Sequence, residues 1–594
     1  PIAATTMSNL SDQSTLSLVF QILERKDKLR LLVTFGLILI GSLLEMASLG
    51  LVIPVVQAVV GGDRRADYGW LPEWFEQLTY TRFVQVLMIA LVLTFLVKNI
   101  FLLGSSYFQQ RFQLAITNRV VQRLFETYLR QPYEFHLQHS SSQLVRNVQE
   151  FSAAVTGNGV TPLLTILTDV VTGIALLGVL LLVQPLSTTI LLGVFGLSGY
   201  LIVLLSRSRT RRWGAERVKH RGVLMEMLLA GLGGIKEIQL FGRDREVVDT
   251  PRSSLHKAAK SFYMFGVLQS VPRAAFEVLA VGGVAVLVLA STVGNQDLQD
   301  ATLIVALFGV VAFRMLPSVN RVIQAAQQFS FGRVALEGAV ESLGLPQRII
   351  ESSRAKNLDT FRQLEIEGLR YRYAGTDVLV TDIDSLTIHS GESVGIVGES
   401  GSGKSTLVDL LIGILSPQEG VIRVNGRDIA TDRRYWQDRI GYVPQHVYLM
   451  DTTIRRNVAF GLPEQAIDND EVVNALEMAN LLEFVQTLPD GLDTVVGERG
   501  VRLSGGQRQR LGIARALYGK PEVIVLDEAT SALDDRTEHE IVESLREISS
   551  NRTLIVVAHR TSTLAHCSRI LRIDRGRIVQ DGTYEEVIGS LSAS

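Results

Sequence analysis

Three long stretches of the chain are almost free of charge, and they limit the possible fold more than any other feature. The only charge in residues 31–62 is Glu45, the only one in residues 83–110 is Lys98, and residues 170–206 contain none. About 20 apolar residues in a helix cross the roughly 30 Å of hydrocarbon in a bilayer. Because backbone polar groups must be satisfied within the bilayer, such stretches form helices. The first half of the chain is therefore predicted to be a helical membrane domain.

The third stretch is long enough for two helices, with a break near Gln184 and Pro185. Two further spans are expected at residues 274–292 and 301–324, which gives six in all. Long polar connections follow the second and fourth spans, with short helices expected near residues 133–148 and 234–245. The run from Arg207 to Arg221 is strongly basic, so this side should be cytoplasmic. These arginines are interpreted as topology anchors, with phosphate binding as the alternative.

Composition divides the chain into four parts. Residues 1–30 are predicted to form a tail and an amphipathic elbow helix, the latter at residues 17–32. Residues 31–330 form the transmembrane domain, residues 331–360 a linker, and residues 361–594 a soluble α/β domain. The formal charge of -2 gives no reason to expect nucleic-acid binding, and a single cysteine excludes an internal disulfide.

A glycine-rich segment early in the α/β domain predicts a nucleotide site. It matches the P-loop pattern, between a strand at residues 393–397 and a helix at residues 405–415. Its backbone N–H groups would surround phosphates, with Lys404 reaching the β and γ phosphates and the Ser405 hydroxyl coordinating Mg²⁺. ATP and Mg²⁺ are therefore the expected cofactors. The segment consists of Gly398, Glu399, Ser400, Gly401, Ser402, Gly403, Lys404, Ser405 and Thr406.

Two acids end a later apolar strand, at residues 523–528. Asp527 is placed to hold the Mg²⁺ shell, and Glu528 to polarise the attacking water as general base. A further apolar strand at residues 553–558 leads directly to His559. The sequence thus predicts a hydrolytic centre with Glu528 and His559 as its catalytic residues.

Through these segments, the domain resembles the nucleotide-binding domain of ATP-binding cassette (ABC) transporters. The run that follows Leu503 is similar to the signature sequence of that family, which faces the γ-phosphate bound by a partner subunit. Its residues Ser504, Gly505, Gly506 and Gln507 are accordingly expected to bind ATP. The whole chain resembles an ABC exporter of fold type I/IV, a six-helix membrane domain followed by the C-terminal P-loop domain.

The same resemblance implies roles for four further residues. Gln445 resembles the residue that joins the metal shell and couples to the membrane domain, and His559 resembles the histidine that contacts the γ-phosphate. Asp534 resembles the acid that communicates between the two sites. Tyr373 matches the aromatic residue that stacks on adenine, with Tyr371 as the alternative.

The chain has one P-loop and one signature sequence, so the resemblance implies that a second copy is needed to complete each ATP site. A homodimer with twelve spans is expected, and a heterodimer with another chain remains the alternative. None of the catalytic positions departs from the family pattern, so both sites should hydrolyse ATP.

Four cations in or beside the spans give the clue to the substrate. A Lys or Arg at the bilayer centre costs about 2.5 to 3.5 kcal/mol. Lys98, Arg273, Arg314 and Arg321 are therefore expected to face a water-filled path for an anionic substrate. Three alternatives stay open: Glu277 neutralises Arg273, Lys98 extends to an interface, and Arg321 lies at the cytoplasmic end.

The membrane half also resembles bacterial lipid-linked oligosaccharide flippases of protein glycosylation, through residues 272–277 and 313–321. This resemblance implies an ATP-driven flippase for a polyprenyl-pyrophosphate-linked oligosaccharide in the bacterial inner membrane, with the nucleotide-binding domain in the cytoplasm. The loop at residues 63–82, which contains Trp70 and Trp74, is a candidate site for the polyprenyl tail. The alternatives are an exporter of another lipid, a peptide or a drug, and an ATP-gated channel or regulator.

Overall fold

The computed structural model describes residues 14–61, 79–183, 185–293, 298–347, 359–528, 552–558 and 561–592. The chain divides into two compact units. The first, the membrane unit, consists of Pro1–Gln131 and Phe135–Arg348, and the second, the nucleotide-binding unit, of Pro132–Glu134 and Ile349–Ser594. Most of the predicted tryptophan-containing loop and much of the predicted linker lie outside the described residues.

Six long helices in the described part of the membrane unit coincide with the six predicted spans. They are α3 (Arg25–Gly61), α4 (Tyr80–Leu129), α7 (Thr161–Val183), α8 (Pro185–Gly233), α11 (Arg252–Val293) and α12 (Leu298–Leu343). The break between α7 and α8 falls where it was predicted, because proline suits the first position of a helix and disrupts the interior of one.

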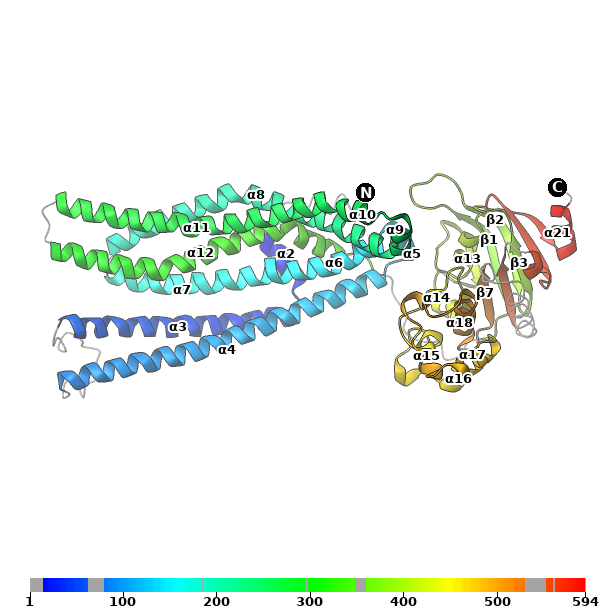
Figure 1. The fold of residues 1–594 in the computed structure, drawn as a ribbon, viewed down its shortest axis with the longest axis horizontal. Helices are drawn as coiled ribbons and strands as arrows, with labels where there is room; N and C mark the ends of the chain where they lie inside the picture. The colour runs from blue at the N-terminus through cyan, green and yellow to red at the C-terminus, as the bar shows by residue number, and fades with distance from the viewer. Residues whose placement is uncertain are drawn as a thin grey trace. The chain divides into compact units, whose positions relative to one another are not determined.

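Four stretches of the described residues are long and apolar enough to qualify as candidate membrane spans. They are Arg25–Ser48, Tyr80–Leu129, Ser141–Ala175 and Asp244–Gly283. Helices α8 and α12 contain apolar segments whose side chains lie partly outside the described part of the chain. In Figure 1, α7, α8, α11 and α12 lie side by side and α3 runs along α4, and α12 packs on α7, α8 and α11.

The N-terminal end differs from its prediction. Instead of one amphipathic helix over residues 17–32, helix α2 (Thr15–Ile22) ends at Leu23, whose backbone is extended, and α3 begins at Arg25. Leu18 and Val19 of α2 are completely buried, and α2 packs on α12 and on the π-helical turn η3 (Val155–Val160). The apolar side of α2 therefore packs on protein, where the sequence predicted a membrane surface.

Short helices occupy both polar connections, as predicted. They are α5 (Tyr133–Gln138), α6 (Ser141–Ala154), α9 (Ile235–Phe241) and α10 (Asp244–Asp249). Helix α12 continues to Leu343, through residues for which the sequence predicted a linker beginning at residue 331. It continues because Leu336 and Ala339 are fully buried in the core of the membrane unit, and because Arg333 donates to Glu337 at 2.7 Å.

The described part of the nucleotide-binding unit contains two sheets. The first is antiparallel, in the order β2 (Thr381–His389), β1 (Gln363–Tyr371), β4 (Glu419–Val424), β5 (Arg427–Asp428). The second has the order β10 (Arg577–Gly582), β9 (Arg569–Asp574), β3 (Ser393–Val397), β8 (Thr553–Val557), β7 (Val523–Asp527), β6 (Ile440–Val443), and only β10 is antiparallel to its neighbour. Every residue of β7 and β8 is buried, which explains why these strands read as unbroken apolar runs.

Helices complete this unit and cover its core. They are α13 (Lys404–Leu411), α14 (Arg433–Gln437), α15 (Ile454–Val458), α16 (Asn469–Met478), α17 (Leu482–Thr487), α18 (Gly505–Leu517), α20 (Thr561–Leu564) and α21 (Tyr584–Ser592), with turns η4 (Glu464–Ala466), η5 (Gly491–Asp493) and η6 (Glu498–Gly500). Because β3 and β7 run in the same direction on either side of β8, their carboxyl ends meet at one edge of the sheet. Ligands of parallel α/β sheets bind at this edge.

Candidate functional site

The P-loop begins where β3 ends at Val397 and leads into α13 at Lys404. The backbone of the loop is packed too tightly for side chains at two positions. A Cβ atom on Gly398 would lie 2.2 Å from the carbonyl oxygen of Ile573, and Gly403, with φ of 102°, would place one 2.4 Å from that of Val380. The loop therefore needs glycine to keep its backbone N–H groups open as a cradle at the helix N-terminus.

Lys404 is held inside this loop. Its ammonium group donates to the carbonyl oxygens of Gly398 at 2.9 Å and Glu399 at 2.8 Å. Burial lowers the pKa of Lys404, while the nearby carboxylates of Glu528 and Asp527 oppose that shift. The cation is thus fixed between the loop and the two acids predicted to serve the metal and the water.

The two acids stand at the carboxyl end of β7, at the same edge as the P-loop. Asp527 is 6% exposed, and its Oδ1 accepts no hydrogen bond from any residue that the structure describes. Burial raises the pKa of Asp527 and Glu528 raises it further, whereas Lys404 and a hydrogen bond from Tyr442 lower it. A buried carboxylate oxygen without a donor fits a hard cation, since Mg²⁺ takes oxygen ligands.

Glu528 sits in an unusual backbone conformation, with φ of 50°. Its N–H donates to the carbonyl oxygen of Val557 at 2.9 Å, which ties the turn to β8. The side-chain amide of Gln445 donates to the Glu528 carboxylate at 2.5 Å. Non-glycine residues with positive φ occur often at functional sites, where surrounding contacts hold them in place. The structure therefore brings Gln445, Lys404, Asp527 and Glu528 together, as the sequence predicted for an ATP and Mg²⁺ site.

The two tyrosines considered for adenine stacking differ in exposure. Tyr371 is 3% exposed and belongs to the core, whereas Tyr373 is half-buried and its hydroxyl is 3.0 Å from the Thr406 hydroxyl. Only Tyr373 has an accessible ring beside the P-loop, so it stays the prediction for the adenine contact.

The signature segment is also placed as predicted, at the N-terminus of α18. The Ser504 hydroxyl accepts from the Gln507 N–H at 3.2 Å, and the Gln507 side chain accepts from the Ser504 N–H at 2.8 Å. This reciprocal capping box fixes the start of the helix and leaves the first N–H groups, at Gly505 and Gly506, available to an anion. Asp534 and His559 lie outside the described residues.

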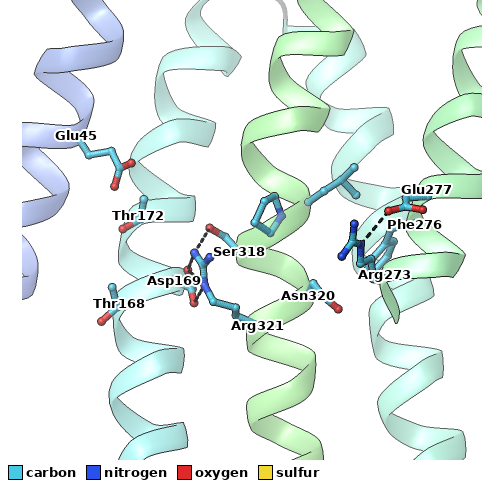
Figure 2. Close-up of a pocket in the computed structure, with 12 residues that line it drawn as sticks. Glu45, Thr168, Asp169, Thr172, Arg273, Phe276, Glu277, Ser318, Asn320 and Arg321 are labelled. Atoms are coloured by element: carbon cyan, nitrogen blue, oxygen red, sulfur yellow. Dashed lines mark hydrogen bonds and ion pairs between the residues drawn. The ribbon is translucent and has the colours of Figure 1, made fainter. Parts of the chain in front are cut away.

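A cavity of about 500 Å³ in the membrane unit brings two of the four predicted cations together (Figure 2). We name it the charged cavity; its charged lining residues are Glu45, Asp169, Arg273, Glu277 and Arg321. Arg321 of α12 points toward Asp169 of α7, with its Nε 2.9 Å from Oδ2, and it also donates to the Ser318 hydroxyl at 3.2 Å. On α11, Arg273 donates to Glu277 at 3.0 Å.

These contacts change the expected charge of the path. The sequence predicted a cationic cavity, but three carboxylates and two arginines line its described part. Arg273 is thus paired with Glu277, as one of the sequence alternatives predicted. Arg321 is paired with Asp169, which was not predicted as its partner. Lys98 is 6% exposed, with its ammonium group 4.4 Å from the centre of the Phe95 ring, and it does not line the described charged cavity. The side chain of Arg314 lies outside the described part of α12.

Two more cavities adjoin this one. The apolar cavity, about 440 Å³, lies among α7, α8 and α12, and almost all its lining is aliphatic or aromatic. The third cavity, about 630 Å³, is lined mainly by Gln and Thr side chains of α4, η3 and α7, among them Gln109, Gln113 and Thr161. Its charged lining residues are Asp169 and Arg321, whose charges offset each other, and we name it the neutral cavity. Asp169 lines all three cavities. Gln109 and Gln113 were not predicted from the sequence to line a cavity. The signal for them was the group of glutamines at the end of the apolar stretch 83–110.

Known protein families match both the membrane unit and the nucleotide-binding unit. A family model described as "ABC transporter" matches residues 381–531, and one described as "ABC transporter transmembrane region" matches residues 31–315. A protein of Alkalilimnicola ehrlichii, named an ATP-dependent lipid A-core flippase, is 32% identical over 84% of this chain and 84% of its own length. A protein of the same name from Chromohalobacter salexigens is 32% identical over 82% of this chain and 83% of its own.

The fold also has a solved counterpart. A bacterial Atm1-family ABC exporter with ATP bound matches with a TM-score of 0.78 and 22% identity, over 95% of this chain and 96% of its own. The exporter fold predicted from the sequence is therefore confirmed. The named relatives move lipid A-core, whereas the sequence segments resembled flippases for polyprenyl-linked oligosaccharides.

Proposed function

The chain belongs to the ABC transporter family, and from that premise we propose that it is an ATP-driven flippase for a phosphorylated glycolipid. As a family member it is an ATPase coupled to transmembrane transport that uses ATP and Mg²⁺. Bound Mg²⁺-ATP would supply the phosphoanhydride bond whose hydrolysis to ADP and phosphate drives the cycle. The substrate class rests on the cavities of the membrane unit.

The position of Asp169 carries the proposal. This one residue borders an apolar cavity, a charged cavity and a neutral cavity rich in Gln and Thr. A glycolipid has three matching parts: a hydrocarbon tail, a phosphate linkage and sugar hydroxyls. Aliphatic walls favour the tail, arginines recognise phosphate in a bidentate manner, and neutral amides and hydroxyls bond sugars. A hydrophobic drug would make little use of the Gln and Thr side chains.

Within this proposal Arg273 and Arg321 contact the phosphate, joined by Arg314 from the same helix as Arg321. An entering phosphate would compete with Asp169 and Glu277 for them. Lys98 remains a candidate contact along the path. We place the protein in a bacterial inner membrane as a homodimer, with the nucleotide-binding unit in the cytoplasm, because the single signature segment requires a P-loop from another copy.

In the nucleotide-binding unit, Lys404 and the glycine-rich backbone would hold the phosphates, with Ser405, Gln445 and Asp527 around the metal. Glu528 would take the proton of the attacking water, assisted by His559, and Asp534 would link the two sites. The hydrogen bond from Gln445 to Glu528 supports this arrangement, in which Gln445 would couple the general base to the membrane unit.

Two lipids fit the proposal. The first is a polyprenyl-pyrophosphate-linked oligosaccharide, which the sequence resemblance favours. The second is a lipid A-core, which the names of the relatives favour. Purified protein in liposomes should be offered each lipid in turn, with ATP-dependent movement between leaflets measured. We expect one of the two to be moved with ATP and left in place without it. If neither lipid is moved, while an unrelated peptide or drug is, the glycolipid proposal is wrong and a general exporter remains.

A further inference from the structure

A fourth cavity, about 710 Å³, lies within the membrane unit among α6, η3, α8, α11 and α12. We name it the basic cavity. Arg146 of α6 and Arg217 and Arg221 of α8 line it, and its described lining contains a single carboxylate, that of Glu150. It therefore has a surplus of positive charge, whereas carboxylates outnumber arginines in the charged cavity. Positive charge collected in a concave site attracts anions.

Aromatic rings hold the central arginine in place. The Arg217 guanidinium lies 5.5 Å from the centre of the Phe331 ring and 5.8 Å from that of Phe262. Phe265 stacks on Phe331 at 4.0 Å, which fixes the ring that Arg217 contacts. A guanidinium that rests on aromatic faces keeps its N–H groups for other acceptors. Arg217 is thus oriented without using up its hydrogen-bond donors.

The remaining donors are only partly satisfied by the protein. Arg221 is paired with Glu150 at 3.4 Å, and Arg146 donates to its neighbour Asn147 at 2.8 Å. The side-chain amide nitrogen of Gln269, which also lines the cavity, is buried and has no acceptor among the described residues. A buried donor without an acceptor destabilises the fold until a ligand or water accepts from it. Arginines and an amide around one space together form a set of donors suited to a multivalent anion.

Space for such an anion is present. A Cβ atom on Gly157 or Gly266, both of which line the cavity, would meet no other atom within 4 Å. The sequence placed Arg217 and Arg221 in a run interpreted as topology anchors, and the structure instead places them with Arg146 around a common cavity.

We propose that the basic cavity binds the phosphate or pyrophosphate group of a lipid at the cytoplasmic end of the membrane unit, as a site separate from the charged cavity. This rests on the proposed function only for the source of the anion, a lipid head group. Arginine is the side chain best matched to phosphate oxygens, through two parallel hydrogen bonds. A soluble phosphate compound shares this chemistry, so the test includes one.

The test measures equilibrium binding to the full chain in nanodiscs, with saturating MgADP to occupy the nucleotide site in every variant. Farnesyl pyrophosphate, farnesol and inorganic pyrophosphate are the three probes. Arg217→Gln and Arg221→Gln should each weaken binding of farnesyl pyrophosphate about tenfold or more, the loss expected for one charge-assisted hydrogen bond. Binding of farnesol should not change. Tight binding of inorganic pyrophosphate to wild type would mean that the anion is soluble and would overturn the lipid assignment.

Two matched pairs of variants distinguish binding in the basic cavity from a general effect of surface charge or of helix packing. Gly157→Leu fills the cavity without changing charge and should also weaken binding, whereas Gly104→Leu, at an equally open glycine of α4, should not. Arg209→Gln removes an exposed charge from the same run of α8 and should have little effect. If Arg209→Gln and Arg217→Gln weaken binding of farnesyl pyrophosphate equally, the binding depends on general surface charge and the proposed site is wrong.

The charged cavity supplies the last comparison. If Arg273→Gln weakens binding while Arg217→Gln and Arg221→Gln do not, the basic cavity is not the site, although the proposed function stands. If the arginines of the basic cavity are required for binding but no glycolipid is transported in liposomes, the proposed function fails and this anion site remains.

Discussion

The ATP site and the charged cavity treat their charged side chains in opposite ways. At the ATP site, Oδ1 of the buried Asp527 has no donor among the described residues, and the Lys404 ammonium group donates to two backbone carbonyls of its own loop. In the charged cavity Arg321 is paired with Asp169 and Arg273 with Glu277. The ATP site keeps charge ready for a ligand, and the charged cavity neutralises charge within the protein.

The surroundings explain this difference. The ATP site lies at the carboxyl edge of a parallel sheet, where a bound Mg²⁺ would serve the unpaired oxygen of Asp527. The charged cavity lies in helices that cross hydrocarbon, where an unpaired cation costs several kcal/mol. An anion that enters the charged cavity would therefore compete with a protein carboxylate for each arginine, and a multivalent anion competes better than a monovalent one.

The largest expected effect is on ATP hydrolysis, and it should leave lipid binding by the membrane unit unchanged. Glu528→Gln should lower ATP hydrolysis by a factor on the order of 10² to 10⁴, the usual contribution of a general base. ATP binding and lipid binding should persist, because the amide keeps the shape of the side chain. Hydrolysis and lipid binding are measured on the same preparation, with Glu585→Gln, an exposed acid of α21, as the control. Loss of lipid binding in Glu528→Gln would mean that the units are not separable in this way.

The second effect breaks a charge pair in the membrane unit. Arg321→Met leaves Asp169, whose side chain is only 4% exposed, as a buried unpaired carboxylate. Because the Arg321 side chain is itself 51% exposed, we expect a destabilisation of about 2 to 3 kcal/mol, below the range for fully buried pairs. Thermal unfolding of the full chain in detergent measures it. The double variant Asp169→Asn with Arg321→Met should recover most of the loss.

Arg273→Met is the matched control for that experiment. Its pair with Glu277 is exposed and lies within one helix, so it should contribute no more than about 0.5 kcal/mol. Both arginine variants should nevertheless weaken stimulation of the ATPase by the lipid, since both line the charged cavity. Equal destabilisation by the two variants would remove the distinction between the buried and the exposed pair.

A third prediction concerns the apolar cavity. Gly173→Leu and Gly196→Leu should fill it, since a Cβ atom at either position meets nothing within 4 Å. The lipid concentration for half-maximal stimulation of the ATPase should rise about tenfold, because each methylene kept from burial costs about 0.8 kcal/mol. Gly193→Leu, an equally open position of α8 outside the described cavity lining, should behave as wild type. A similar rise in Gly193→Leu would exclude the tail from this cavity.

The smallest effect returns to the nucleotide-binding unit. Burial, with a further contribution from Asp527, raises the pKa of Asp409 on α13 to about 6. The fold therefore loses stability as the pH rises from about 4, the unfolded pKa of this group, to about 6, and the loss stays constant above that pH. Asp409→Asn should stabilise the protein by about 1 to 2 kcal/mol at pH 8, allowing for solvent screening, and by about a third as much at pH 4.5. Thermal unfolding at both pH values tests this, and an equal gain at both would contradict it.

The same contrast explains what the sequence could predict. The P-loop, the acids at the end of β7 and the signature segment are contiguous motifs whose strand, loop and helix context is visible along the chain. Asp169 and Arg321 lie 152 residues apart and meet only because α7 packs on α12. The basic cavity depends likewise on α6, η3, α8, α11 and α12 coming together. Helix spans follow from apolar runs, but which faces meet is decided by packing.

A glycolipid substrate is tested most sharply by offering the membrane unit the parts of that lipid separately. ATPase activity and flipping in liposomes are measured with a complete pyrophosphate-linked glycolipid, with its soluble head group and with its free lipid tail. Because Asp169 joins the apolar, charged and neutral cavities, only the complete glycolipid should stimulate the ATPase and be moved across the bilayer. Equal stimulation by the tail alone, or by an uncharged lipid of the same length, would contradict a glycolipid substrate.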